Sequence, residues 1–208
     1  MTQQVLIDTE FHLEKIDPKN RDIFRSALPF LETRKNKPHT YLAYQYALDL
    51  LKHETGRPEI VMPAVILHDV GWSTISETEQ LTAFGPIVKN SSLQRKHEIE
   101  GVAIAERILS NLNWEQHLMS KILDIIDGHD TTRQARSLED AIVKDADKLW
   151  RVSKIGFQTD VQRFKTQPVS YIKYLREAAH GWFLTGRGRK IALAELQMRE
   201  SELEFTTN

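Results

Sequence analysis

The chain has 208 residues and carries 28 basic and 29 acidic side chains, so its formal net charge is −1. This balance excludes the broad basic surface that proteins use to hold extended nucleic acid. The absence of cysteine excludes disulfide scaffolds, thiolate zinc sites, iron–sulfur clusters and cysteine nucleophiles. A metal site must therefore use imidazole and carboxylate ligands, and eight histidines are present to supply imidazole.

Helical periodicity dominates nearly the whole chain. The apolar spacing and the capping residues predict helices over 18–35, 40–54, 59–69, 91–110, 114–127, 137–150, 168–180 and 189–205. Only 3–13 has a pattern that fits a strand. The sequence therefore predicts an all-α fold, a compact helical bundle with short connections.

Caps and glycines set the expected ends of the first three helices. Asp17 is placed to cap the first helix, with Pro18 at its first position. Gly56 is expected to close the second helix. The third helix is apolar on nearly every side, which predicts a buried central helix, and Gly71 is expected to end it.

Polar capping residues set the expected starts of the later helices. Ser91 is expected to cap the fourth helix. The pair Asn113 and Gln116 resembles a capping box for the fifth helix, and the pair Ser137 and Asp140 marks the start of the sixth.

The chain shows no sign of membrane insertion or export. Its longest strongly apolar stretch, 60–67, contains Pro63 and is too short to cross a bilayer. The first ten residues lack the basic segment and apolar run of a secretory signal. We therefore expect a cytoplasmic protein that makes no membrane contact.

His68 and Asp69 directly follow five apolar residues at the end of the buried third helix. A buried carboxylate is costly unless it is paired, protonated or bound to metal. Neighbouring helical residues point about 100° apart, so both side chains can face one ion only where the helix ends. The alternative is a histidine at a helix C-terminus beside an exposed aspartate.

Further candidate metal ligands lie on or beside other predicted helices. They are His39, His97, His129 and either Asp145 or Asp147, because helical spacing leaves the choice between these two aspartates open. Bundle proteins build one- and two-metal sites from side chains on facing helices in this way. Imidazole and carboxylate ligands suit Mn²⁺, Fe²⁺, Co²⁺, Ni²⁺, Zn²⁺ or Mg²⁺.

Taken in chain order, the candidate ligands resemble the H…HD…H…H…D signature of the dinuclear branch of the HD-domain superfamily, which consists of metal-dependent phosphohydrolases. The matching residues are His39, His68, Asp69, His97, His129 and Asp147. The segment IVKDADKLW also resembles the DADKL segment of small bacterial members. This second resemblance favours Asp147 over Asp145.

The resemblance implies one or two divalent metal ions held by these six residues, with Asp69 bridging two ions. It implies a single HD-like domain over 1–208. Its motif core would occupy 39–150, and the C-terminal helices of 151–208 would pack on that core.

The resemblance also implies hydrolysis of a phosphate mono- or diester, either nucleotide-like or another small phosphorylated metabolite. The metal would lower the pKa of a bound water molecule, and the resulting hydroxide would be the nucleophile. Besides Asp69, we expect Asp130 to take part in catalysis as a proton acceptor or as a partner of a ligand imidazole, with Glu98 as the alternative. Lys148, beside the metal ligand Asp147, is a further catalytic candidate.

Local cations must attract an anionic phosphate, because the net charge of the chain does not. The candidates for substrate binding are Arg133, Lys148 and Arg151, and surface ion pairs are the alternative role for Lys148 and Arg151. The segment 70–73 has neither the acidic residue of the nucleotidase branch nor the lysine of the cyclic-dinucleotide branch. The substrate therefore stays open.

Two other functions fit the same ligand positions. Some dinuclear members of the superfamily resemble di-iron oxygenases that cleave C–C or C–P bonds. A non-catalytic nucleotide-binding module is the second alternative, although the intact ligand set argues against it. The expected partner is a small phosphorylated substrate, and the sequence leaves the identity of the metal and a homo-oligomer open.

Overall fold

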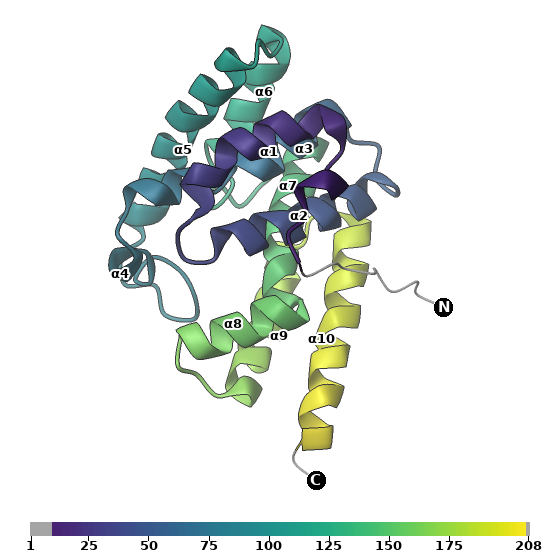
Figure 1. Ribbon diagram of the computed structural model, residues 1–208. Helices are drawn as coiled ribbons and strands as arrows, with labels where there is room; N and C mark the ends of the chain where they lie inside the picture. The colour runs from purple at the N-terminus through teal and green to yellow at the C-terminus, as the bar shows by residue number, and fades with distance from the viewer. Residues whose placement is uncertain (1–9, 207–208) are drawn as a thin grey trace.

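The computed structural model describes residues 10–206, and no strand occurs among them (Figure 1). The all-α prediction is confirmed. The elements are η1 Leu13–Lys15, α1 Pro18–Leu31, α2 Asn36–Leu51, α3 Pro58–Leu67, η2 Val70–Thr74, α4 Glu77–Gln80, α5 Ser92–Asn111, α6 Gln116–Ile126, α7 Leu138–Val152, α8 Lys154–Arg163, α9 Pro168–Trp182 and α10 Gly186–Thr206.

The strand expected over 3–13 is not found in the part of that segment that the structure describes. Residues 3–9 lie outside the described residues. The stretch 10–12 is irregular, and Leu13 begins a short 3-10 helix.

Two predicted caps are confirmed. The Asp17 side chain accepts a hydrogen bond from the backbone N–H of Lys19 at the start of α1. The Ser137 side chain accepts one from the N–H of Asp140 at the start of α7. These contacts satisfy N–H groups that have no partner inside the helix.

The boundary between the first two helices was predicted wrongly. α1 ends at Leu31, and the chain then turns through Arg34 and Lys35, whose φ angles are 46° and 61°. α2 begins at Asn36, four residues before the expected start at position 40. Pro38 falls in the first turn of α2, where a helix needs no N–H donor, so it does not delay the start.

Three other expected boundary signals have different roles. Gly56 does not close α2, which ends at Leu51. Asn113 does not cap α6, because that helix begins at Gln116 after Glu115, and Ser91 makes no side-chain cap on α5. A capping pattern in sequence has an effect only if the backbone turns at the right residue, and at Asn113 φ is 53°.

Gly71 does not end α3 but lies within η2. A Cβ atom at Gly71 would lie 1.9 Å from the carbonyl oxygen of His97 and 2.5 Å from the backbone nitrogen of Gly101, both on α5. The residue must therefore be glycine because two backbones meet there. This contact brings α5 against the chain that follows α3.

α3 lies at the centre of the bundle, as its apolar sequence predicts. All its residues from Ile60 to Leu67 are buried, and it packs against α1, α2, α6 and α7. Figure 1 shows α5 and α6 at one end of the molecule, and α8 and α9 at the other. The helices α8, α9 and α10 all contact α7.

α8 was not predicted as a separate helix. Ser153 breaks the helical path after α7, and its side chain accepts a hydrogen bond from the N–H of Gly156 to start α8. Among the described helices, none has the length and apolar character needed to cross a membrane.

Candidate metal centre

Six histidine and aspartate side chains converge where α2, α3, α5 and α7 meet. All of them are buried, and they are the six residues predicted from sequence: His39, His68, Asp69, His97, His129 and Asp147. Buried polar side chains need partners, and these six side chains face one another.

The end of α3 allows two consecutive residues to face the same centre. His68 still has helical backbone angles, whereas Asp69 has left the helix with φ −102° and ψ 3°. The chain then turns into η2. The expectation that the doublet sits at a helix end, where both side chains can converge, is confirmed.

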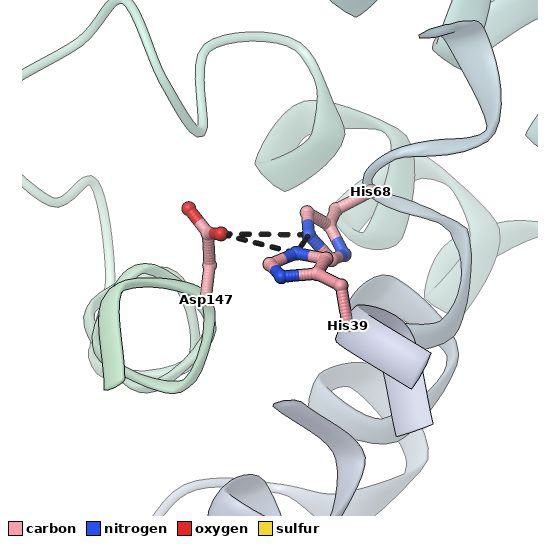
Figure 2. Close-up of side chains that lie close together, drawn as sticks. All are labelled: His39, His68 and Asp147. Atoms are coloured by element: carbon pink, nitrogen blue, oxygen red, sulfur yellow. Dashed lines mark hydrogen bonds and ion pairs between the residues drawn. The ribbon is translucent and has the colours of Figure 1, made fainter. Parts of the chain in front are cut away.

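The first group of side chains consists of His39, His68 and Asp147 (Figure 2). The Nε2 atoms of the two histidines lie 3.1 Å apart. Oδ1 of Asp147 lies 3.3 Å from Nε2 of His39 and 3.7 Å from Nε2 of His68. Three potential ligand atoms from three different helices thus face a single point.

The second group consists of His97, His129 and Asp130. The Nε2 atoms of the two histidines lie 3.2 Å apart, and Oδ2 of Asp130 lies 3.7 Å from Nε2 of His97. The structure therefore brings Asp130, predicted only as a catalytic residue, within reach of the same ion as the two histidines.

Asp69 lies between the two groups. Its Oδ2 is 3.3 Å from Nε2 of His39, and its Oδ1 is 3.7 Å from Nε2 of His129 and 3.9 Å from that of His97. Paired imidazole nitrogens around a central carboxylate, all buried, form a set of donors that fits divalent metal ions. The residues present therefore fit the implied metal.

Backbone contacts fix the orientation of two histidine rings. Nδ1 of His68 lies 2.7 Å from the carbonyl oxygen of Val65, and Nδ1 of His129 lies 3.0 Å from that of Ile126. A proton on Nδ1 that is donated to a carbonyl leaves Nε2 free to bind metal. Both rings thus turn Nε2 toward the centre.

The His97 ring is held by stacking. It lies parallel to the indole of Trp72, with ring centroids 4.0 Å apart, and its Nδ1 has no hydrogen-bond partner among the described residues. The indole N–H of Trp72 donates to Oδ1 of Asp69 at 3.0 Å. Trp72 therefore positions two candidate ligands, the central Asp69 and His97 of the second group, in addition to packing in the core.

The loop after α6 holds His129 in place. Gly128 has φ 126°, which favours glycine, and Nζ of Lys144 donates to the backbone oxygens of Gly128 and His129 at 2.8 and 3.3 Å. Lys144 is itself paired with Asp140 at 3.0 Å. An N-terminal turn of α7 thus supports a ligand from another segment.

The charges of the site keep its carboxylates ionised. Burial raises the pKa of Asp69, but the neighbouring His68 and His129 outweigh this and hold that pKa well below its usual range. Burial opposes ionisation at Asp147 too, yet Lys148 and the histidines hold the pKa of Asp147 well below its usual range. Ionised carboxylates are the form that binds metal.

Lys148 links Asp130 and Asp147. Its Nζ lies 2.5 Å from Oδ1 of Asp130 and 2.6 Å from Oδ2 of Asp147, and both carboxylates raise the pKa of this buried amine against the effect of burial. Glu98, the alternative to Asp130, turns away from the centre. It accepts hydrogen bonds from the backbone N–H groups of Asp130 and Thr131 and so holds this loop.

The structure places Asp147, and not Asp145, beside the histidines. The Asp145 carboxylate accepts hydrogen bonds from the backbone N–H groups of Leu184 and Thr185, at 2.7 and 2.9 Å, and from the Thr185 hydroxyl. It anchors the start of α10, whereas Asp147 faces the histidines. Two positions along α7 therefore carry carboxylates that serve different parts of the fold.

A small pocket that is partly open to solvent lies beside these ligands. Two predicted substrate-binding residues, Lys148 and Arg151, line it, whereas Arg133 is exposed and does not. The lining consists of Arg34, Asn36, His39, Asp69, Trp72, Phe84, Asp130, Asp147, Lys148, Trp150, Arg151 and Arg163.

Two arginines of the pocket were missed from the sequence. Arg34 lies in the turn between α1 and α2, inside what was predicted as a helix end, and Arg163 lies at the end of the unpredicted α8. No local sequence pattern identifies either arginine as a pocket residue. Both line the pocket only because α8 packs near the turn before α2.

The comparison with protein families agrees with this geometry. The sequence model of the HD domain family matches residues 38–151, which contain all six predicted ligands and just over half of the chain. No curated protein and no solved structure matches the chain.

Proposed function

Because the chain belongs to the HD domain family, whose members are mostly metal-dependent phosphohydrolases, we propose that it hydrolyses a phosphate mono- or diester of a small metabolite. The observation that carries the proposal is the buried set of four histidines with Asp69 and Asp147, in which Asp69 also forms a group of its own with His68 and His129. A pocket with cationic side chains adjoins that set, which suits an anionic substrate.

The two groups of side chains suggest places for two divalent ions. His39, His68 and Asp147 would hold one ion, His97, His129 and Asp130 would hold the other, and Asp69 faces both groups. When bound, such ions polarise a phosphoryl group and make water more acidic. That the ions are divalent metals, and that two of them bind, are both parts of this proposal.

The residues around the ligands have roles of their own. Lys148 lines the pocket, and its ammonium group, which is paired with Asp130 and Asp147, would also donate to a phosphoryl oxygen of the substrate. Asp130 offers Oδ2 to the second group and Oδ1 to Lys148. Its predicted role as a proton acceptor stays a prediction.

The test is metal-dependent hydrolysis by the protein and by an Asp69→Ala variant. Metal-stripped protein is supplied with Mn²⁺, Co²⁺, Ni²⁺ or Mg²⁺, and release of p-nitrophenol from p-nitrophenyl phosphate and from its bis ester is measured. We expect Asp69→Ala to lose metal binding and hydrolysis together, because this carboxylate serves both groups. Asp124→Ala, at an exposed aspartate, is the matched control.

Full activity in Asp69→Ala would show that the histidine and aspartate cluster is not the active site. A wild-type protein that stays inactive with every metal, but consumes oxygen after anaerobic loading with iron, would replace hydrolysis by the di-iron oxygenase alternative.

A further inference from the structure

Three arginines surround one aromatic ring in the pocket. The guanidinium carbons of Arg34, Arg151 and Arg163 lie 4.0, 5.3 and 5.5 Å from the centroid of the Phe84 ring. They come from three separate places in the chain, namely the turn before α2, the end of α7 and the end of α8. All three are largely buried and line the pocket.

A single carboxylate serves two of these arginines. The fully buried Asp160 accepts hydrogen bonds from Nη1 of Arg151 at 2.8 Å and from Nη1 of Arg163 at 3.1 Å. The hydroxyl of Tyr171 donates to the same carboxylate at 2.7 Å. Asp160 thus accepts three hydrogen bonds, but its single negative charge balances only one of the two guanidinium charges.

Arg34 shares its carboxylate with the metal ligands. Its Nη2 lies 3.8 Å from Oδ2 of Asp69, which also faces His39, and its buried Nε has no hydrogen-bond partner among the described residues. Arginine is protonated at neutral pH. Because Asp69 also faces the histidine groups, the three guanidiniums carry more positive charge than Asp160 alone balances.

Such a cluster is costly unless an anion joins it. Like charges held close together in a poorly solvated place repel each other, and the face of the Phe84 ring offsets only part of that repulsion. Guanidinium groups match the oxygens of phosphate and carboxylate with paired donors. Arg34 contacts Asp69, so an anion bound here lies next to the group held at the metals.

We propose that Arg34, Arg151 and Arg163 form a second anion-binding site beside the metal centre, and that the substrate carries two anionic groups. One is the phosphoryl group that is hydrolysed, and the other, a phosphate or carboxylate, lies among the three guanidiniums. The substrate class is a diphosphate, a bisphosphate or a phosphorylated carboxylate of a small molecule. This inference rests on the proposed function for its first anionic group.

The test compares two probes that cannot be hydrolysed, methylphosphonate and methylenediphosphonate, which carry one and two phosphonate groups. Their dissociation constants are measured by calorimetry on Mn²⁺-loaded protein from which free metal has been removed. We expect the diphosphonate to bind about tenfold more tightly or better, since charge-assisted hydrogen bonds to a second group add to affinity. In Arg163→Gln this preference should fall below about threefold.

Two further variants separate the site from general effects. Arg34→Gln should lose the preference as well, and it keeps the inference testable if Arg163→Gln does not fold. Arg107→Gln is the matched control, because this exposed arginine also stacks on a phenylalanine ring, Phe30, but lies outside the pocket. It should keep the full preference. Circular dichroism and Mn²⁺ titration establish that each variant is folded and loaded.

The outcomes distinguish this inference from the proposed function. A diphosphonate preference that survives in both Arg163→Gln and Arg34→Gln would mean that the metal ions alone hold both groups, and it overturns the second site. Equal binding of the two probes by the wild type also overturns it. The wild type could also fail to hydrolyse every ester and still show a diphosphonate preference that depends on the arginines. That result would support the second site and contradict the hydrolase proposal.

Discussion

The two histidines of the second group differ in how firmly they hold a proton. Burial, together with the charge of His129, lowers the pKa of His97 to about 4. Burial acts in the same direction on His129, but the carboxylates of Asp69 and Asp130 outweigh it and raise the pKa of His129 to about 9. Without metal, the pair therefore holds one proton at neutral pH, on His129.

The affinity of the site for metal should therefore depend on pH. A metal ion can bind Nε2 of His129 only after the proton leaves, so below about pH 9 the apparent affinity should fall by up to about tenfold for each pH unit. The affinity of the second group should rise toward about pH 9 and then level off, with nothing added by His97, and the raised pKa of His68 should make the first group lose affinity in acid as well. Competition with a fluorescent chelator between about pH 6 and about pH 9 measures this, and a flat profile would contradict it.

At the scale of single residues, the sequence predicted which histidines and aspartates lie together far better than the residues around them. These candidate ligands stand out because polar side chains interrupt apolar helices, and the family resemblance gave their order. Arg34 and Asp160 carry no such mark, because nothing in their local sequence shows that they face a pocket. Arg133 lies only a few residues after His129, yet the loop leaves it exposed.

Among the elements, the contact between η2 and α5 has the most direct effect on the site. Gly71 lies against the backbone of α5 at His97 and Gly101. His97 reaches the centre from that same turn of α5 and stacks on Trp72 of η2. The spacing of these two backbones therefore sets the position of one metal ligand.

Gly71→Ala should destabilise the protein and weaken the second metal group. The added Cβ would lie 1.9 Å from a backbone oxygen, which no side-chain rotation relieves, so we expect a loss of about 3 kcal/mol, the upper end for overpacking. Gly101→Ala is the control, because its Cβ would make only ordinary contacts, with the Ile126 side chain at 3.4 Å and with backbone atoms of Gly71 and His68 at 3.6 Å. Urea unfolding and Mn²⁺ titration measure both effects.

An Ala variant at position 71 as stable as the control, with unchanged metal affinity, would show that α5 is free to shift.

Helix existence was easier to predict than helix boundaries. The apolar periodicity identified α1, α2, α3, α5, α6, α7, α9 and α10, because each buries one face or, for α3, nearly all faces. The predictions for the start of α2 and for the role of Gly71 were wrong, because both features depend on contacts with distant parts of the chain. α8 was missed because the break falls at Ser153 alone, and the glycine of this junction, Gly156, lies inside the first turn of α8 rather than between the two helices.

For the whole molecule, a bound ion would connect distant segments. The candidate ligands come from α2, from the chain after α3, from α5, from the loop after α6 and from α7. Any ligand that binds only the folded state stabilises it in proportion to the logarithm of its concentration over the dissociation constant. Metal binding and folding should therefore be coupled.

Removal of the metal should lower the melting temperature. At a free metal concentration about one hundred times the dissociation constant, the stabilisation is about 2.7 kcal/mol, which for a chain of this size corresponds to about 5–10 °C. Differential scanning calorimetry with Mn²⁺ and with excess chelator measures the shift. Asp69→Ala should melt at the same temperature in both solutions, and an unchanged wild-type melting temperature would contradict the coupling.

The two kinds of side chain in the pocket come from different stretches of the chain. Every candidate metal ligand lies within 38–151, the part that matches the HD domain family, whereas Arg34 and Arg163 lie outside it and Arg151 is its last residue. If the metal ligands and the three arginines act as proposed, residues within 38–151 carry out the reaction. The residues on either side of this stretch then largely select the substrate. Chimeras that exchange only the flanks should therefore keep the reaction while changing the molecule it acts on. Grouping relatives by the shared stretch alone would merge proteins with different substrates.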